Sequence, residues 1–250
     1  MGKTYAGNTS DESVIPKKIY AGDASNHSVP CKVAYCGDSN GKSVEVYRNT
    51  TLPSEYQKVE YIYDSNATEY IDTGVYPNSD TRLQIVFKLV NQSGNTSLFG
   101  CSGNGINNHL HIISWDYDLP TPGSSFRYYY GNVSKGIKLN YSVNTIDINK
   151  NYDGTVYLNS ETFKYTGTFS NMPSTYLLFA YHNGSTVTLP SGNRCNIYSF
   201  KAWQYGAMIR DMYPCYLKSD TQVVGMYDLI GNQYYGNSGT GIFYKGPNVN

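Results

Sequence analysis

Paired carboxylates come first among the residues that could do chemistry, because two of them can hydrolyse a glycosidic bond. Retaining glycosidases hold their two carboxyl groups about 5–5.5 Å apart. Asp116 and Asp118 would share one face of a strand, since alternate residues point the same way. No third acid follows them, Pro120 lies close behind, and Glu161 is the only glutamate after Glu69. The sequence therefore predicts no enzyme that uses acids from one strand, and leaves open an inverting pair from separate strands.

Histidines and a calcium-like run are the candidate metal ligands. His109 and His111 alternate on one expected strand, and His182 could add a third imidazole. Zinc needs three or four ligands, so two exposed strand histidines without a metal are the favoured interpretation. The run 147–154 has acidic and amide side chains at alternate positions, but Tyr152 stands where an EF-hand requires glycine. We predict no metal and no cofactor.

Aromatic residues beside amides and acids could bind a sugar. Sugar rings present apolar C–H faces that pack on aromatic rings, and hydroxyls that bond to polar side chains. Neighbours of this kind occur at the end of one expected strand, in a tyrosine run and near His182. The candidate ligand-binding residues are Trp115, Asp116, Asp118, Tyr128, Tyr130, Asn132, His182 and Asn183. The alternative for each tyrosine is a structural role in cross-strand pairs.

Composition excludes several other classes of function. Formal net charge is zero, which argues against the basic surface that a nucleic-acid partner requires. No apolar run reaches the roughly 18 residues of a membrane span, and the N-terminus lacks a signal-peptide core. Five scattered cysteines without a Cys-x-x-Cys predict free, mostly buried thiols.

The same composition indicates an all-β protein, with 27 Tyr, 24 Gly and only 15% charged residues. Residues 81–90 alternate, with Leu83, Ile85, Phe87 and Leu89 on one face. The apolar run 176–181 predicts a central strand, and Asp153-Gly154 predicts a two-residue hairpin turn. Further strands are expected at 109–115, 126–130, 144–152, 155–158, 162–165, 195–203 and 223–229. Many short antiparallel strands favour a two-sheet sandwich or jelly roll.

The N-terminal region carries an internal repeat. The motif that begins at Lys17 returns at Lys32, and each copy predicts two short strands around a turn. Asn40-Gly41 is a strong hairpin turn. We therefore expect a flexible tail over 1–14, a small β-hairpin segment over 15–50 and a sandwich over 52–247. Such small hairpins bury little apolar area, so the segment should dock onto another surface.

Both ends of the expected sandwich resemble a known family. The stretches 52–62 and 69–74, and later 197–201, 209–214, 225–231 and 235–243, look like the concanavalin A-like (laminin G-like) domains of phage and prophage structural proteins. The repeat resembles short β segments found beside such domains. The resemblance implies an antiparallel β-sandwich of the jelly-roll type, used by relatives for sugar binding, protein contacts or glycoside hydrolysis. Relatives also bind calcium at a sandwich rim, but no residue here can be assigned to such a site.

A non-catalytic virion protein is the function that these features favour. It would attach to host-surface or mucosal glycans from a tail fibre or head decoration, as a homo-oligomer, after assembly in the bacterial cytoplasm. Residues 15–50 would contact other virion subunits. Two alternatives stay open: a purely structural decoration or connector protein without a ligand, and a glycoside hydrolase on the same fold.

Overall fold

The computed structural model describes most of the chain after residue 50 and four short segments before it. The described residues are 20–22, 28–30, 33–37, 43–48, 51–64, 66–91, 96–103, 109–114, 126–131, 133–137, 139, 141–164, 169, 171–189 and 194–249. The chain divides into two units, Met1–Thr51 and Leu52–Asn250, each with its own sheets.

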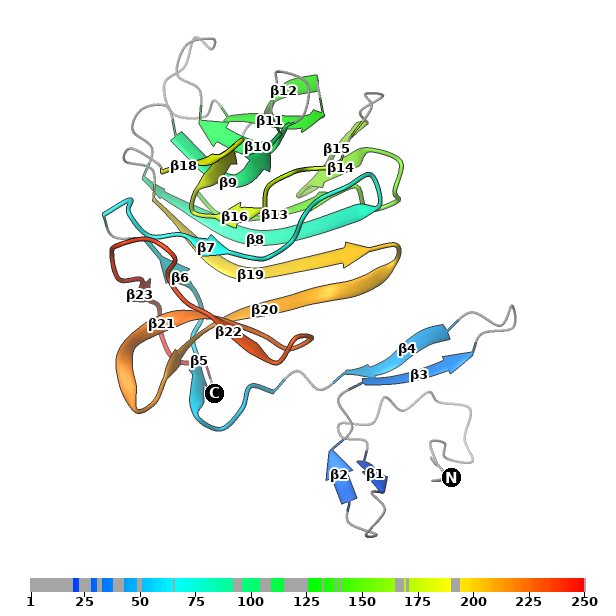
Figure 1. Cartoon of the computed structure of the whole chain (residues 1–250), viewed down its shortest axis with the longest axis vertical. Helices are drawn as coiled ribbons and strands as arrows, with labels where there is room; N and C mark the ends of the chain where they lie inside the picture. Colours follow the sequence, from blue (N-terminus) through cyan, green and yellow to red (C-terminus); the bar gives the residue numbers. More distant parts are fainter. Residues whose placement is uncertain are drawn as a thin grey trace. The chain divides into compact units, whose positions relative to one another are not determined.

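The N-terminal unit contains two antiparallel strand pairs (Figure 1). Strand β1 (Tyr20–Gly22) pairs with β2 (Ser28–Pro30), within the first copy of the repeat. Strand β3 (Val33–Gly37) pairs with β4 (Ser43–Arg48), within the second copy. The expected Asn40-Gly41 turn and the expected tail over 1–14 lie outside the described residues.

One sheet of the C-terminal unit, the large sheet, is antiparallel throughout its described strands. These are β5 (Tyr56–Lys58), β6 (Ile62–Tyr63), β8 (Thr81–Asn91), β13 (Val143–Ile148), β14 (Thr155–Leu158), β15 (Glu161–Lys164), β19 (Arg194–Gln204), β20 (Ala207–Leu217), β21 (Asp220–Asp228), β22 (Gln233–Tyr235) and β23 (Tyr244–Lys245). The main order is β15-β14-β13-β8-β19-β20-β21-β22. Strand β5 also pairs with β20, and β6 joins β19 to β23.

The second sheet, the small sheet, lies opposite. Its strands are β7 (Ile71–Asp72), β9 (Thr96–Ser102), β10 (His109–Ser114), β11 (Phe126–Gly131), β12 (Val133–Ile137), β16 (Leu177–Leu178), β17 (Tyr181–Asn183) and β18 (Thr186–Thr188). The main order is β12-β11-β10-β9-β16-β7. Strand β17 pairs in parallel with β9 and antiparallel with β18, and the other pairings are antiparallel.

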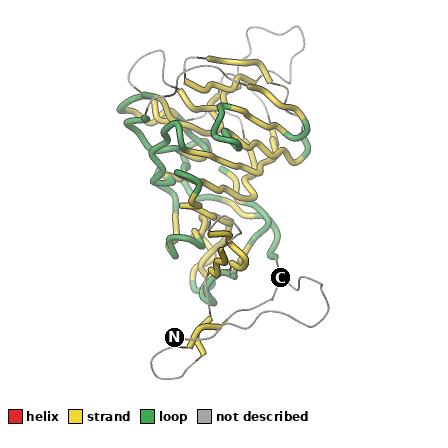
Figure 2. Tube along the Cα trace, turned by 90° about the vertical axis from the view of Figure 1, so that its right-hand side faces the viewer, coloured by secondary structure: helices red, strands yellow, loops and turns green. Residues whose placement is uncertain are grey.

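The two sheets pack face to face over one apolar core. Ring contacts cross between them: the centroids of Phe87 on β8 and Phe99 on β9 lie 5.0 Å apart. Figure 2 shows strands and loops without a helix over the described residues. No helix in this part of the chain is long and apolar enough to cross a membrane. The prediction of an all-β fold with two antiparallel sheets is therefore confirmed.

Strand β8 follows the predicted alternation closely. Leu83, Ile85 and Phe87 are fully buried and Leu89 is 1% exposed. Arg82 and Gln84 point to the outer face, where both donate hydrogen bonds to the Asp147 carboxylate. The apolar face of β8 therefore forms the middle of the core-facing side of the large sheet.

Strand β19 departs from simple alternation. Its register with β8 shifts between Ile197 and Ser199, so Ile197 and Phe200 are both fully buried. Trp203 consequently lies on the outer face, half-buried, with the guanidinium carbon of Arg82 4.1 Å from its ring centroid. Unbroken alternation would put Trp203 on the face of Ile197, and the register shift puts it on the opposite face.

Residues 176–180 are buried as predicted, but the run 176–181 is not one strand. Leu177 lies opposite Gly100 in an antiparallel pairing, and Tyr181 lies opposite the same residue in a parallel one. The chain changes direction near Phe179, which has a φ of 65°. A single straight strand could not pair with β9 in both the antiparallel and the parallel direction.

The connection between β13 and β14 is longer than the predicted two-residue turn. It spans residues 149–154, and Asn149 organises it at a φ of 60°. The Asn149 amide donates to the carbonyls of Ser79 and Thr81 and accepts from the N–H of Gly154. An asparagine that tolerates the left-handed conformation therefore replaces the expected Asp153-Gly154 turn.

Candidate functional site

The outer face of the small sheet brings four rings together. His109 and His111 come from β10, Tyr129 from β11 and Tyr181 from β17. The centroid of the His111 ring lies 4.5 Å from that of Tyr129, 5.1 Å from that of Tyr181 and 5.2 Å from that of His109. We call these four residues the aromatic face.

The register of three strands brings these rings together. His111 pairs with Tyr129 on one side and with Gly100 on the other, and Gly100 pairs with Tyr181. Gly100 has a φ of 146°, and a Cβ at this position would lie 2.2 Å from the Cβ of His111. Because glycine has no side chain, the rings of β10 and β17 can meet across β9.

His111 is the buried member of the aromatic face. Its side chain is only 6% exposed, and its Nδ1 has no hydrogen-bond partner among the described residues. Burial, and secondarily the nearby His109, lower its pKa from 6.5 to about 3, so the ring is neutral at pH 7. The expectation of two exposed histidines is therefore wrong for His111, which packs over the space that Gly100 leaves open.

Polar side chains border the aromatic face on the β17–β18 hairpin. Asn183, Thr186 and Thr188 are exposed. Asn183 pairs with Thr186 and Tyr181 with Thr188, so these side chains project to the same side as Tyr181. Within the described residues the Asn183 amide makes no hydrogen bond. The Thr186 hydroxyl donates to the Asn183 backbone carbonyl oxygen, so the Asn183 amide and the Thr188 hydroxyl are the polar groups left beside the rings to bond to a sugar.

His182 has a structural role instead. Its ring is half-buried, and its Nδ1 lies 3.2 Å from the Thr175 carbonyl oxygen. Strand alternation turns it away from Tyr181 and Asn183. Of the two predicted residues on β17, only Asn183 therefore belongs to the border of the aromatic face.

Tyr128 and Tyr130 are corrected from candidate ligand contacts to core residues. Their cross-strand partners are Ile112 and Leu110, and all four side chains face the core. Tyr128 is fully buried and Tyr130 is 4% exposed. Burial raises the pKa of Tyr130 to about 12. The residue between them, Tyr129, faces outward and joins the aromatic face.

Four further predicted site residues lie outside the described residues: Trp115, Asp116, Asp118 and Asn132. The sequence did not single out Tyr181. The strand pairing of β17 with β9 is what brings it to His111, and no local pattern reports that pairing.

Two buried carboxylates on the large sheet have structural hydrogen bonds. Asp147 accepts two hydrogen bonds from Arg82, at 2.8 and 2.6 Å, and one from Gln84. Asp228 is fully buried and accepts from the backbone N–H groups of Asp211, Ile230 and Gly231. These hydrogen bonds hold both carboxylates in fixed positions on the sheet.

The described part of the chain shows no cluster of metal ligands, and its cysteine thiols are buried. No group of three or more His, Cys, Asp or Glu side chains there could hold a metal ion. Cys101, Cys195 and Cys215 are free and buried, as predicted for these thiols. Burial raises the pKa of Cys215 to about 12, so this thiol is not a nucleophile near neutral pH.

No model of a known protein family matches this chain, and no curated protein matches it.

Proposed function

We propose that the Leu52–Asn250 unit is a non-catalytic glycan-binding module with a concanavalin A-like jelly-roll fold. We propose further that it belongs to a bacteriophage particle, and that residues 15–50 attach it to other virion subunits. The resemblance of its end segments supports the phage context. The aromatic face supports the choice of ligand.

The chemistry of the aromatic face supports glycan binding. Tyr129 and Tyr181 are half-exposed rings on which the C–H face of a sugar can pack. Asn183 and Thr188 stand beside them and can bond to hydroxyls. A neutral imidazole at His111 fills the space beneath the rings without placing a charge there. The observation that carries the proposal is this meeting of rings from β10, β11 and β17.

A binding role without turnover agrees with the structural bonding of two buried acids. Arg82 donates to Asp147, and backbone N–H groups donate to Asp228. One shallow site would bind a glycan weakly, and several copies on one particle would gain strength through avidity. We therefore also propose that the protein acts as a homo-oligomer.

Binding of the full-length protein to an array of bacterial and mucosal glycans tests this proposal. We expect retention of a subset of glycans and no change in their length after incubation. Tyr181→Ala and Tyr129→Ala should each weaken binding about tenfold or more, because sugar rings lose the aromatic ring on which they pack.

Tyr141→Ala is the matched control, since Tyr141 is 51% exposed and lies outside the aromatic face. Retained binding in both test variants would refute the proposed site. Shortened glycans would refute the non-catalytic role.

A further inference from the structure

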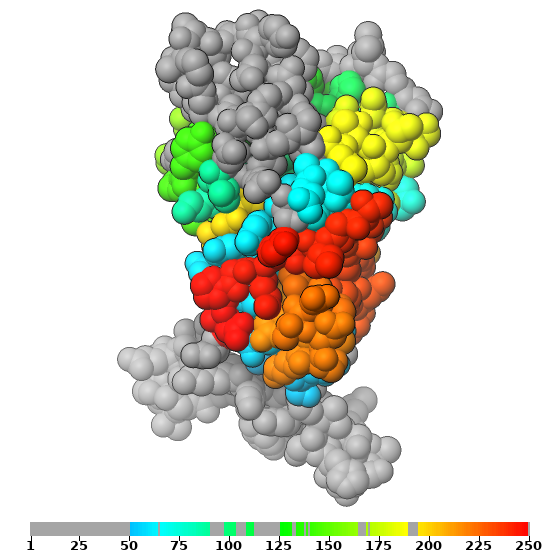
Figure 3. Space-filling model, turned by 90° about the vertical axis from the view of Figure 1, so that its left-hand side faces the viewer, coloured from blue at the N-terminus to red at the C-terminus, as the bar shows by residue number. Residues whose placement is uncertain are grey.

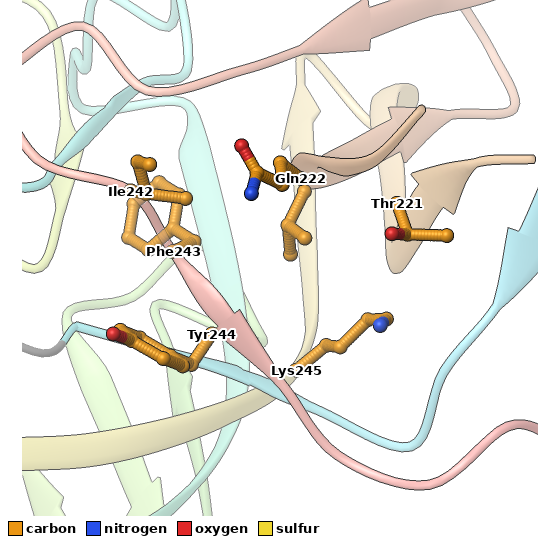
Figure 4. A pocket seen from close by; sticks show the side chains of 7 residues that line it. Thr221, Gln222, Ile242, Phe243, Tyr244 and Lys245 are labelled. Atoms are coloured by element: carbon orange, nitrogen blue, oxygen red, sulfur yellow. The ribbon is translucent and has the colours of Figure 1, made fainter. Parts of the chain in front are cut away.

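A pocket of about 330 Å³ lies at the C-terminal end of the chain, away from the strands that carry the aromatic face. We call it the C-terminal pocket; it is lined by Thr221, Gln222, Val224, Ile242, Phe243, Tyr244 and Lys245. Figure 4 shows residues of β21 on one side and the Ile242–Lys245 segment on the other. In Figure 3, red C-terminal residues border the orange region of β20 and β21. Its volume is within the range of small-ligand sites.

Lys245 gives the C-terminal pocket its charge. It pairs with Ile62 across β23 and β6, so its side chain projects to the core side of the large sheet. Its Nζ lies 4.4 Å from the ring centroid of Tyr216. No carboxylate of the described residues forms an ion pair with it. An unpaired ammonium beside apolar walls attracts an anion more strongly than one in open water.

The rest of the C-terminal pocket has apolar and polar lining residues. Val224 and Phe243 are buried at 6% and 2% exposure, while Ile242 is 52% exposed at the rim. Thr221 and Gln222 are exposed, and their side chains make no hydrogen bond within the described residues. The C-terminal pocket therefore offers one cation, one apolar wall, two free polar side chains and the exposed ring of Tyr244, which stacks on Tyr63.

The geometry points to an acidic N-acylated sugar as the ligand of the C-terminal pocket. A carboxylate would pair with the Lys245 ammonium, the acyl methyl group would contact Val224 and Ile242, and hydroxyls would bond to Gln222 and Thr221. Neutral sugars lack the carboxylate that would pair with Lys245, and simple uronic acids lack the acyl methyl group. This inference rests on the proposed function for its choice of a saccharide, and it adds a second, charge-selective site.

Saturation-transfer NMR on the full-length protein tests the inference. The probes are the methyl glycosides of N-acetylneuraminic acid, of N-acetylglucosamine and of glucuronic acid, each at millimolar concentration. We expect the strongest transfer to the acetyl methyl group of the first probe. Lys245→Gln should weaken its binding at least tenfold, because the variant keeps most of the side chain and removes the charge.

Lys150→Gln is the matched control, since Lys150 also lies over a tyrosine ring, with its Nζ 5.1 Å from the Tyr157 centroid. We expect this variant to bind like the wild type. Equal binding of all three probes, no transfer to any of them, or unchanged binding in Lys245→Gln would overturn the inference. If a peptide with a free C-terminal carboxylate displaced the N-acetylneuraminic acid probe at a lower concentration than the free sugar does, the ligand would be a peptide and the saccharide assignment would be wrong.

Failure of this inference is distinguishable from failure of the proposed function. If array glycans bind and Tyr181→Ala releases them while Lys245→Gln has no effect, only the inference fails. If Lys245→Gln weakens the acidic probe while Tyr129→Ala and Tyr181→Ala change nothing on the array, the aromatic face fails instead.

Discussion

Gly100 is the residue on which the aromatic face depends most directly. It lies between His111 and Tyr181 in the sheet, and its backbone occupies a region that other residues rarely adopt. The Leu110 carbonyl oxygen would lie 2.4 Å from a Cβ at this position. Neither that oxygen nor the backbone of β10 can move without loss of strand pairing.

Substitution of Gly100 by alanine should therefore be strongly destabilising. We expect Gly100→Ala to lower the free energy of unfolding by about 3 kcal/mol or more, from the clash and the unfavourable φ. Urea unfolding, followed by tyrosine fluorescence, measures this loss in the free energy of unfolding. Gly136→Ala is the control, because a Cβ there meets nothing within 4 Å, and its effect should be small.

His111 makes stability depend on pH in a predictable direction. Its folded-state pKa, about 3, lies below its unfolded value, so the unfolded chain binds the proton first as pH falls. Stability is therefore fully present above pH 6.5 and is lost between pH 6.5 and 3, by up to about 1.4 kcal/mol per pH unit from this group. The His111→Phe variant should show a shallower decline over this window in parallel unfolding curves. Parallel declines in the two proteins would contradict the assignment.

At the scale of elements, the β13–β14 hairpin shows how a side chain can replace a tight turn. Asn149 binds the carbonyls of Ser79 and Thr81, which precede and begin β8. The same amide oxygen accepts from Gly154 at the far end of the connection. One residue thus closes the hairpin and ties it to the neighbouring strand.

Loss of this amide should loosen the edge of the large sheet. We expect Asn149→Ala to cost about 2 kcal/mol, because two backbone carbonyls, one of them buried, lose a donor and alanine tolerates positive φ poorly. Hydrogen exchange should accelerate in β13 and β14 more than in β19. Asn151→Ala removes only one exposed hydrogen bond, to the Tyr157 hydroxyl, and serves as the control.

Some strands can be predicted from their sequence pattern better than others. Strand β8 shows unbroken alternation, and its core face could be predicted residue by residue. Strand β20 carries Arg210, Asp211 and Pro214, which together obscure a strand pattern. In the sheet, Arg210 donates to the Thr73 carbonyl oxygen, and Asp211 lies 3.3 Å from the Lys201 Nζ on the neighbouring strand β19.

At the scale of the molecule, the chain has two units that form separate sheets. The Leu52–Asn250 unit contains the apolar core, the aromatic face and the C-terminal pocket. None of the strand pairings joins it to β1, β2, β3 or β4 among the described residues. Its folding should therefore not require the N-terminal unit.

Removal of residues 1–51 tests this independence. We expect the truncated protein to melt within a few degrees of the full chain, with one cooperative transition by calorimetry. Its glycan retention per site should be unchanged, while any self-association or particle attachment through 15–50 should be lost. A truncated protein that is unfolded or aggregated would contradict the separation of the units.

The amino-acid sequence by itself determined the all-β class, the inward face of β8 and the zero formal net charge of the chain. These depend on composition and on a two-residue period, which are local properties. Tertiary structure decided that Tyr128 and Tyr130 are core while Tyr129 is not, and that Tyr181 meets His111 across Gly100. Strand neighbours and register set these outcomes, and both depend on pairings between segments far apart in the chain.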